Sequence, residues 1–393
     1  MTEVFIVAGQ RTAIGAFAGA LKDIAPAELA STVVKAAMAR SGTAADEVGH
    51  VAWGQVIQTE PRDAYIARVA AVNGGIPIET PAFTVNRLCG SGLQAVISAA
   101  QTILLGDTDV ALCGGSESMS RAPFLSQAMR WGVKMGDTAM VDMLDGALRD
   151  PFGRILMGVT AENVAARYAV SREAQDALAV ESHRRASHAI REGRFRDQIV
   201  GVDIKTRSGP VVFAEDEHVR HDVKEADLAG LRTIFKKEAG SVTAGNASGI
   251  NDGAAAIVLA SAEAVRRSGA TPLARLVAYG HAGVDPNYMG IGPVPATRAA
   301  LARAGLTVRD LDVIESNEAF AAQACAVSRE LDFDPAIVNP NGSGISLGHP
   351  VGATGAINVV KAVHELRRSG GRYALVTMCI GGGQGISAIF ERV

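Results

Sequence analysis

The chain has 393 residues, of which 48% are hydrophobic and 20% are charged, with 38 Lys and Arg against 41 Asp and Glu. A chain of this length and composition can bury a large core in two or three folded units, which excludes extensive disorder. The formal net charge is only −3 and the chain has no long basic run. We therefore expect neither nucleic acid nor a membrane surface as a partner.

The first seven residues resemble a strand more than a signal peptide, because no basic region precedes the apolar residues. The most apolar stretches of the chain are interrupted, or end, before the roughly 20 residues that span a bilayer. Four cysteines without a CxxC spacing are typical of a reducing compartment, and they argue against a disulfide scaffold or a zinc site. These features together predict a cytoplasmic protein.

Strands and helices are expected to alternate from the N-terminus onward. The predicted elements are a strand over 4–7, a helix over 27–40, a strand over 51–56, a helix over 93–104 and a strand over 110–113. Apolar residues recur in the helix over 93–104 with the 3.6-residue period of a buried face. Such alternation predicts a mainly parallel sheet that is covered by helices on both faces.

Residues 120–245 differ in composition from the rest of the chain and contain several methionines. The methionines are followed by a charged helix that is expected over 171–192 and that Ser171 caps. We interpret this segment as an inserted loop domain and the charged face of its helix as solvated. The same reasoning places the histidines at 183, 188, 218 and 221 on the surface.

One internal repeat has a constant offset of 263 residues. It pairs glycine 42 with glycine 305 (305 − 42 = 263), glycine 92 with glycine 355, and leucine 112 with leucine 375. The second copy is expected to contain a helix over 295–304, a strand over 313–316, a helix over 355–366 and a strand over 373–378. The predicted domains are a first half over 1–119 completed by about 246–271, the loop domain over 120–245, and a second half over 272–393.

Cys89 lies between a predicted strand and the helix that Gly90-Ser91-Gly92 opens. The N-terminus of a helix favours a thiolate, which makes Cys89 a candidate nucleophile. The alternative is that Cys89 is a small buried apolar residue, the ordinary role of a free cysteine.

His349 stands in a glycine-rich loop ahead of the helix that begins near Gly355. At the repeat offset it corresponds to Asn86 (349 − 86 = 263), so pseudosymmetry predicts that its loop lies beside the Cys89 loop. A histidine there suits a general base for a thiol, although a loop histidine can also serve only in packing.

The other three cysteines receive different interpretations. Cys379 ends a strand and enters the run Gly381-Gly382-Gly383, where backbone N–H groups can face an oxyanion, and a functional or a packing role remains open for it. Cys113, which is expected to end the equivalent strand of the first half, and Cys325, which lies among alanines, are interpreted as packing residues. None of the glycine runs has the spacing of a dinucleotide- or phosphate-binding loop, so a nicotinamide enzyme is not expected.

Five blocks of residues resemble the signature motifs of the thiolases and occur in the order of that family. They are 86–92 (NRLCGSG), 245–253 (GNASGINDG), 317–321 (NEAFA), 341–355 (NGSG through GHP to GATG) and 379–383 (CIGGG). The resemblance covers essentially the whole chain, and within the family it is greatest to bacterial short-chain β-ketothiolases. It implies an α/β fold with a five-layered αβαβα core built from two similar halves, plus an inserted loop domain that covers coenzyme A. It also implies a homotetramer.

The resemblance also implies roles for individual residues. Cys89 would be the acyl-accepting nucleophile, His349 its base, Cys379 the acid and base at the substrate α-carbon, and Asn317 the holder of a water that helps His349 bind the thioester oxygen. Backbone N–H groups of Cys89 and Gly381 would form the second oxyanion hole. The residues expected to contact coenzyme A or the acyl group are Ser248, Arg220, Phe235, Met157, Leu156, Ala319, Phe320 and Met289. Leu156 departs from the histidine of biosynthetic acetoacetyl-CoA thiolases, which leaves the acyl preference open.

The implied activity is reversible thiolysis of a 3-ketoacyl-CoA or, in reverse, Claisen condensation of acetyl-CoA with a short acyl-CoA. No metal or redox cofactor is expected, since the coenzyme A thioesters are substrates. A decarboxylating ketoacyl synthase of related fold would be expected to use a second histidine where this chain has Cys379. An acyl-CoA carrier on a thiolase scaffold would be expected to lack Cys89 or His349, and both are present.

Overall fold

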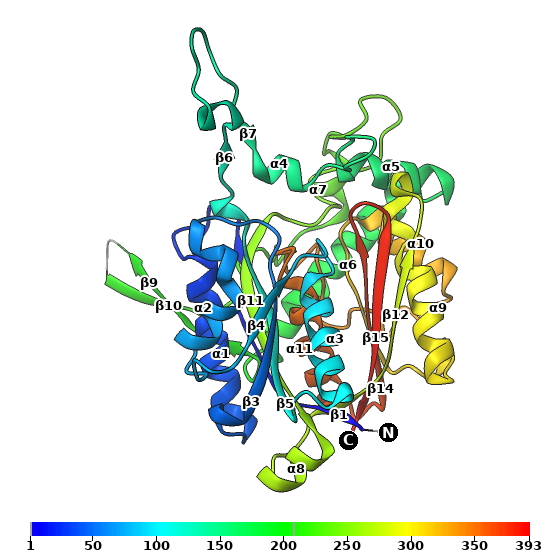
Figure 1. Ribbon diagram of the computed structural model, residues 1–393. Coiled ribbons are helices and arrows are strands. Elements are labelled where there is room, and N and C mark those ends of the chain that lie inside the picture. Colours follow the sequence, from blue (N-terminus) through cyan, green and yellow to red (C-terminus); the bar gives the residue numbers. More distant parts are fainter. Residues whose placement is uncertain (1, 207–208) are drawn as a thin grey trace.

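The computed structural model describes residues 2–206 and 209–393. Met1, at which the predicted first half begins, and residues 207–208 of the predicted loop domain lie outside the described residues. Figure 1 shows two groups of strands with helices between them and on both outer sides, and a long hairpin that projects from the body.

The first half contains the elements that the sequence predicts, most of them longer than expected. Its strands and helices are β1 (Val4–Thr12), β2 (Gly15–Ala16), α1 (Pro26–Ser41), β3 (Val48–Gly54), α2 (Ile66–Asn73), β4 (Ala82–Val85), α3 (Ser91–Leu105), β5 (Val110–Ser118), β11 (Asn251–Ser261) and α8 (Ala262–Ser268). The expectation that Cys113 ends its strand is wrong, because small residues continue β5 to Ser118. Cys113 is fully buried within that strand.

The second half follows after the insertion. Its strands and helices are β12 (Ala274–Gly283), α9 (Pro293–Ala304), β13 (Val313–Ser316), α10 (Ala321–Glu330), α11 (Thr354–Ser369), β14 (Tyr373–Ile380) and β15 (Gln384–Arg392). The turn between the last two strands is glycine-rich because Gly382 and Gly383 have positive φ angles of 79° and 82°, which side chains disfavour.

The main sheet runs in the order β13-β14-β15-β12-β1-β11-β5-β3-β4. The expectation of a mainly parallel sheet is wrong, since only β3 with β4, β3 with β5 and β13 with β14 pair in parallel among these neighbours. The centre is antiparallel because β15 returns from a hairpin with β14 and because β11 returns from the long insertion to lie between β1 and β5.

The repeat is confirmed by topology, since β3-β5-β11-β1 in the first half corresponds to β13-β14-β15-β12 in the second. Helices α1 and α2 cover one outer face, α9 and α10 cover the other, and α3 packs against α11 between the two groups of strands. This is the expected five-layered arrangement. Two equivalent glycines make the central contact possible, because a Cβ on Gly92 would lie 2.6 Å from the Ala356 nitrogen and one on Gly355 would lie 2.2 Å from the Leu93 nitrogen.

Helix α3 is the only described segment that is long and apolar enough, by length and composition, to cross a membrane. It lies in the central layer, and most of its residues between Ser91 and Ile103 are buried in the fold. Its apolar character is therefore that of a core helix.

The insertion contains β6 (Phe124–Leu125), β7 (Val141–Asp142), α4 (Met143–Ala147), α5 (Met157–Arg167), α6 (Arg172–Arg191), β8 (Ile199–Val200), β9 (Val202–Thr206), β10 (Gly209–Phe213) and α7 (Glu225–Ala229). The Ser171 side chain caps α6 by accepting from the Ala174 N–H at 3.2 Å. The expectation that His183 lies on the surface is wrong, because His183 is only 3% exposed and its Nδ1 accepts from the backbone N–H of Arg220.

Candidate active site

A tight turn presents Cys89 just before α3. The Ser91 hydroxyl donates to the Leu88 carbonyl at 2.7 Å and accepts from the Arg87 N–H at 2.8 Å, which closes the turn. Leu88 has a φ of 47°, a conformation that non-glycine residues adopt at an energetic cost. The strained backbone directs the Cys89 side chain into a cavity between the two halves.

The thiol of Cys89 is neutral in this environment. Burial raises its pKa to about 11, although the N–H groups of Gly381 and Cys89 oppose the shift, and the nearby Glu117 raises the pKa further. The N–H groups favour the thiolate as the sequence predicts, but desolvation outweighs them in the resting state. A base must take the proton from Cys89 when the sulfur attacks.

His349 projects into the same cavity from the loop ahead of α11. Its backbone N–H donates to Asn251 Oδ1 at 2.9 Å, and its ring Nδ1 lies 2.7 Å from the Thr354 hydroxyl. Burial lowers the pKa of the ring to about 4, so the imidazole is neutral at physiological pH and can accept a proton. The structure thus brings Cys89 and His349 to one cavity, as the repeat predicts.

Asn317 and Cys379 stand around this pair. The side-chain nitrogen of Asn317 lies 3.4 Å from His349 Nε2, while its fully buried Oδ1 has no partner among the described protein atoms. Cys379 is buried beside Met289 and Ala319, which line the cavity. Burial, together with the neighbouring Cys89, raises the pKa of the Cys379 thiol, so this thiol is protonated in the resting enzyme.

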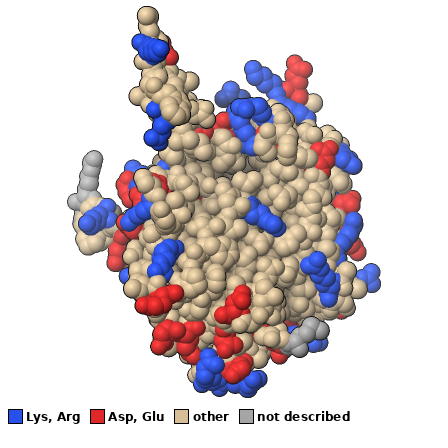
Figure 2. Space-filling view, in the orientation of Figure 1, with Lys and Arg blue, Asp and Glu red and all other residues tan. Residues whose placement is uncertain are grey.

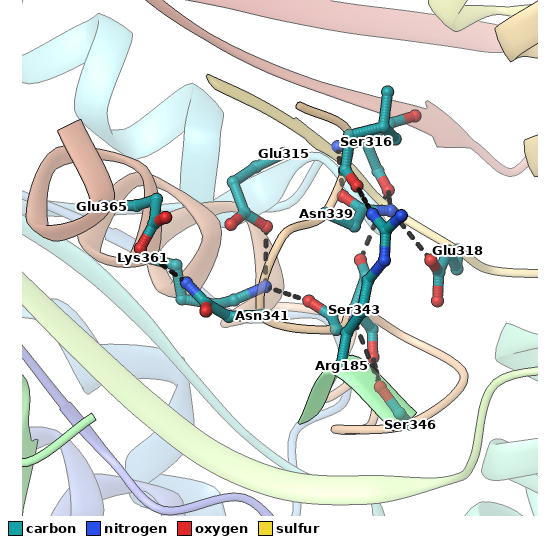
Figure 3. A network of polar contacts seen from close by, with 12 residues as sticks. Arg185, Glu315, Ser316, Glu318, Asn339, Asn341, Ser343, Ser346, Lys361 and Glu365 are labelled. Atoms are coloured by element: carbon teal, nitrogen blue, oxygen red, sulfur yellow. Dashed lines mark hydrogen bonds and ion pairs between the residues drawn. The ribbon is translucent and has the colours of Figure 1, made fainter. Parts of the chain in front are cut away.

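A buried polar network supports the loops that carry Asn317 and His349 (Figure 3). Glu318 accepts from Ser182 of α6 at 2.6 Å and from Asn339 at 2.8 Å. Beside it, Lys361 of α11 donates to Glu315 at 2.6 Å and to the Gly342 carbonyl at 2.7 Å. The network therefore links α6, β13, α11 and the loop that leads to His349.

Glu117 connects the two halves directly at the site. Its buried carboxyl accepts from the backbone N–H groups of Val56, Ile57 and Gly352 at distances of 3.0, 3.1 and 2.9 Å. Val56 belongs to the loop after β3, whereas Gly352 follows His349. The carboxyl has no cationic partner among the described residues, and burial raises its pKa to about 8.

The Cys89 cavity is small and mostly apolar, with a volume of about 60 Å³. Besides Cys89 and His349, its lining includes Gly381, Val56, Leu88, Met119, Ala147, Leu148, Met157, Ser248, Met289, Ala319, Phe320 and Val351. A longer cleft of about 530 Å³ adjoins it and shares Met157, Ser248, Phe320 and His349. The cleft leads towards the surface at Arg220, which is exposed.

The residues expected to bind coenzyme A are divided between these two spaces. Leu156, Phe235 and Arg220 line only the cleft, whereas Ala319 and Met289 line only the cavity. Phe235 packs edge-on against Phe320 with 6.3 Å between ring centroids, and the Arg220 N–H donates to His183 at 3.1 Å. Leu156 therefore lies on the side of the cleft and does not contact the Cys89 cavity.

Several residues of the site are not predicted from the sequence, among them Glu117, Thr354 and Leu148. Glu117 does stand in an otherwise small-residue run, Gly114-Gly115-Ser116-Glu117-Ser118, and a charged residue in a buried strand is a signal that could have been used. Thr354 has its partners His349 and Pro350 only five and four residues away, but a threonine at the start of a helix carries no comparable signal, and neither does the apolar Leu148.

The chain matches two family models, "Thiolase, N-terminal domain" over residues 4–263 and "Thiolase, C-terminal domain" over residues 270–392. It is 68% identical to Beta-ketothiolase BktB of Cupriavidus necator over 100% of this chain and 99% of that protein. It is 49% identical to an acetyl-CoA acetyltransferase of Chromobacterium violaceum over 99% of this chain and 100% of that protein.

Solved structures agree with these sequence matches. The crystal structure of human mitochondrial 3-ketoacyl-CoA thiolase superimposes with a TM-score of 0.98 at 44% identity, over 100% of this chain and 99% of that chain. Similarity of this extent in both sequence and fold, together with the Cys89 and His349 geometry, identifies the family: the chain belongs to the thiolases and is a β-ketothiolase, an acyltransferase.

Proposed function

We propose that the enzyme interconverts a short 3-ketoacyl-CoA with acetyl-CoA and an acyl-CoA through an acyl group on Cys89. The observation that supports this most directly is the placement of the Cys89 thiol, the His349 ring and the Gly381 backbone in one small apolar cavity. A thiol and a neutral imidazole are the groups that nucleophilic acyl transfer requires.

In the condensing direction, the Cys89 sulfur attacks the carbonyl carbon of acetyl-CoA and its proton passes to His349. Collapse of the tetrahedral intermediate breaks the carbon–sulfur bond to coenzyme A, which leaves as the thiol with that proton. N–H groups of Gly381 and Cys89 stabilise the oxyanion. These two donors already face the Cys89 sulfur in the resting enzyme.

The second stage makes the carbon–carbon bond. Cys379 passes its thiol proton to the neutral His349 and, as the thiolate, removes a proton from the α-carbon of a second acetyl-CoA. Asn317 and the protonated His349 stabilise the enolate oxygen. The enolate then attacks the acyl group on Cys89 and releases the Cys89 sulfur, which takes the proton back from His349. Because each step is a proton or acyl transfer, we propose that no metal or redox cofactor takes part.

The substrates would occupy the two spaces differently. The acyl group would lie in the cavity beside Met289 and Ala319, and the pantetheine would lie in the cleft beside Ser248, Met157 and Phe320. Phe235 and Arg220 would meet the nucleotide end. A cavity of about 60 Å³ favours short acyl groups.

A homotetramer in the cytoplasm is part of the proposal. Strand β4 lies at the edge of the sheet, and Phe83 on it is exposed. Exposed edges of this kind pair readily with another chain. The face seen in Figure 2 carries few charged side chains in its centre. The hairpin over 124–142 exposes large apolar residues, namely Met129, Trp131, Met135 and Met140, which is typical of an interface between subunits.

The test is to incubate the enzyme with 3-ketoacyl-CoAs of four, five, six and eight carbons plus coenzyme A, and to follow loss of the ketoacyl thioester. We expect thiolysis that is fastest for the four- and five-carbon substrates and an acyl adduct on Cys89. Turnover of a malonyl thioester, with no thiolysis of any ketoacyl-CoA, would instead favour a decarboxylating synthase.

A further inference from the structure

The hydroxyl of Thr354 contacts the ring of His349 on the side opposite the cavity. We propose that Thr354 is a positioning residue that keeps the proton of the neutral His349 ring on Nδ1 and leaves Nε2 free to accept the proton of Cys89. This inference rests on the proposed role of His349 as the base for Cys89.

The hydroxyl group of Thr354 has a single hydrogen to donate. Thr354 is the first residue of α11 and is 2% exposed, and its Oγ1 donates to the Pro350 carbonyl at 2.9 Å. The same oxygen lies 2.7 Å from His349 Nδ1. The Pro350 carbonyl also accepts from the backbone N–H groups of Ala353 and Thr354. When the hydroxyl hydrogen is donated to Pro350, Oγ1 can only accept from His349, and Nδ1 then carries the hydrogen.

The contact made by the other ring nitrogen of His349 is consistent with this assignment. Asn317 places its side-chain nitrogen 3.4 Å from His349 Nε2, and an amide nitrogen donates but does not accept. Nε2 therefore presents its lone pair. Because burial lowers the pKa of the ring to about 4, the ring carries one hydrogen in the resting enzyme, and both contacts select the same tautomer.

The tautomer matters for the first chemical step. When Cys89 attacks the thioester carbon, the thiol hydrogen passes to Nε2 and the ring becomes an imidazolium with hydrogens on both nitrogens. The Nδ1 hydrogen remains donated to Thr354, which accepts it in both charge states. Collapse of the intermediate returns the Nε2 hydrogen to the sulfur of the leaving coenzyme A. A ring with its hydrogen on Nε2 could not take the proton of Cys89.

The repeat places a hydroxyl group at the equivalent position in the first half. Ser91 occupies the position equivalent to Thr354 (354 − 91 = 263) and is also the first residue of its helix. Its hydroxyl bonds only to the backbone of the turn that presents Cys89. In both halves the first hydroxyl of the helix orders the preceding loop, but only Thr354 contacts a titratable side chain.

Three variants separate this role from a purely structural one. Thr354→Val removes the hydroxyl and keeps the shape, and Thr354→Ser keeps the hydroxyl. Thr32→Val is the matched control, because Thr32 also donates to a carbonyl four residues earlier, Glu28, at 2.9 Å, but lies on the outer helix α1. Rates of Cys89 acetylation would be measured by rapid quench and mass spectrometry, with kcat and KM of acetoacetyl-CoA thiolysis and melting temperatures.

We expect Thr354→Val to slow Cys89 acetylation and kcat by about 10- to 100-fold, the usual effect of losing an orienting partner, with KM changed less than about twofold. The acetylation rate and kcat of Thr354→Ser should stay within about threefold of the parent values. Those of Thr32→Val should equal the parent values. A folded Thr354→Val with acetylation within about twofold of the parent would overturn the proposal. So would equal losses in the Val and Ser variants.

A measurement on the parent enzyme keeps the proposal testable if Thr354→Val does not fold. Solid-state NMR of enzyme labelled with ¹⁵N in the histidine rings, with the His349 signals assigned from a His349→Asn variant, reports which nitrogen is protonated. We expect hydrogen on Nδ1 at pH 7, and hydrogen on Nε2 would overturn the proposal. Failure of the parent to acetylate Cys89 would instead contradict the proposed function, and the tautomer measurement does not depend on that outcome.

Discussion

The carboxyl of Glu117, at the end of β5, accepts a hydrogen bond of 2.9 Å from the backbone N–H of Gly352, three residues after His349. The same carboxyl also accepts from Val56 and Ile57, in the loop after β3. A single buried side chain thus connects the half that carries Cys89 to the loop that carries His349. This connection can be tested by replacing the carboxyl.

Glu117→Gln should change the pH dependence of stability. Burial raises the folded-state pKa of Glu117 from 4.5 to about 8, so between these values the folded protein binds more protons than the unfolded chain. Stability contributed by this group therefore falls as pH rises from about 5 to about 8. Glutamine does not titrate, so the stability of the parent relative to Glu117→Gln should decrease over this interval.

Urea midpoints of the parent and Glu117→Gln, measured at pH 5.5, 7 and 8.5, check this expectation. The exposed Glu79→Gln serves as the control and should follow the parent at each pH. A difference between parent and Glu117→Gln that is constant with pH would show that the carboxyl does not titrate in this range.

Cys89→Ala should abolish acyl transfer, because Cys89 is the only thiol among the described residues that line the cavity with His349. We expect kcat to fall by more than about a thousandfold, as for loss of a nucleophile in other enzymes. Mass spectrometry after brief exposure of the parent to acetyl-CoA should show one acetyl group, on Cys89. An adduct on Cys379 with Cys89 unmodified would reverse the assignment.

Cys379→Ser should separate the two stages of the reaction. Formation of the acyl-enzyme needs no base at the α-carbon, so this variant should still acetylate at Cys89. It should lose condensation and the exchange of acetyl-CoA α-protons with solvent deuterium, both followed by NMR. Exchange at the parent rate in Cys379→Ser would rule out the proposed role of Cys379.

The pH dependence of Cys89 alkylation by iodoacetamide should show that Cys89 and His349 are both neutral in the resting enzyme. Burial raises the pKa of the Cys89 thiol to about 11 and lowers that of the His349 ring to about 4. Since only the thiolate reacts, the alkylation rate should rise about tenfold per pH unit between pH 7 and 10. A plateau near pH 7, as a preformed thiolate–imidazolium pair would give, contradicts this expectation.

Leu156→His tests which space determines acyl range. Leu156 lines the cleft but not the Cys89 cavity, so the substitution should change KM for both substrates and leave the ratio of kcat/KM for five-carbon and four-carbon ketoacyl-CoA nearly unchanged. One extra buried methylene is worth roughly 0.8 kcal/mol, about a fourfold change in affinity. A fourfold or greater change in that ratio would show that Leu156 contacts the acyl group.

Much of the fold could be predicted from the sequence, because each half is encoded by local periodicity and by a repeat that runs at a constant offset. The helices α1, α3, α9 and α11 and the strands β5 and β14 all lie where apolar spacing indicates. Cys89 and His349 could also be predicted as site residues from the sequence, since glycines and helix starts mark both loops. The repeat offset places these loops side by side.

The direction of the central strands, the protonation state of Cys89 and the hydrogen-bond partners of Glu117 depend on the tertiary structure. The antiparallel centre arises because β11 returns after an insertion of more than a hundred residues, a pairing that no local pattern specifies. The neutral thiol of Cys89 follows from desolvation by distant segments, which outweighs the local helix N-terminus. Glu117 and Gly352 are 235 residues apart, so only folding of the two halves against each other brings the carboxyl to the loop of the catalytic histidine.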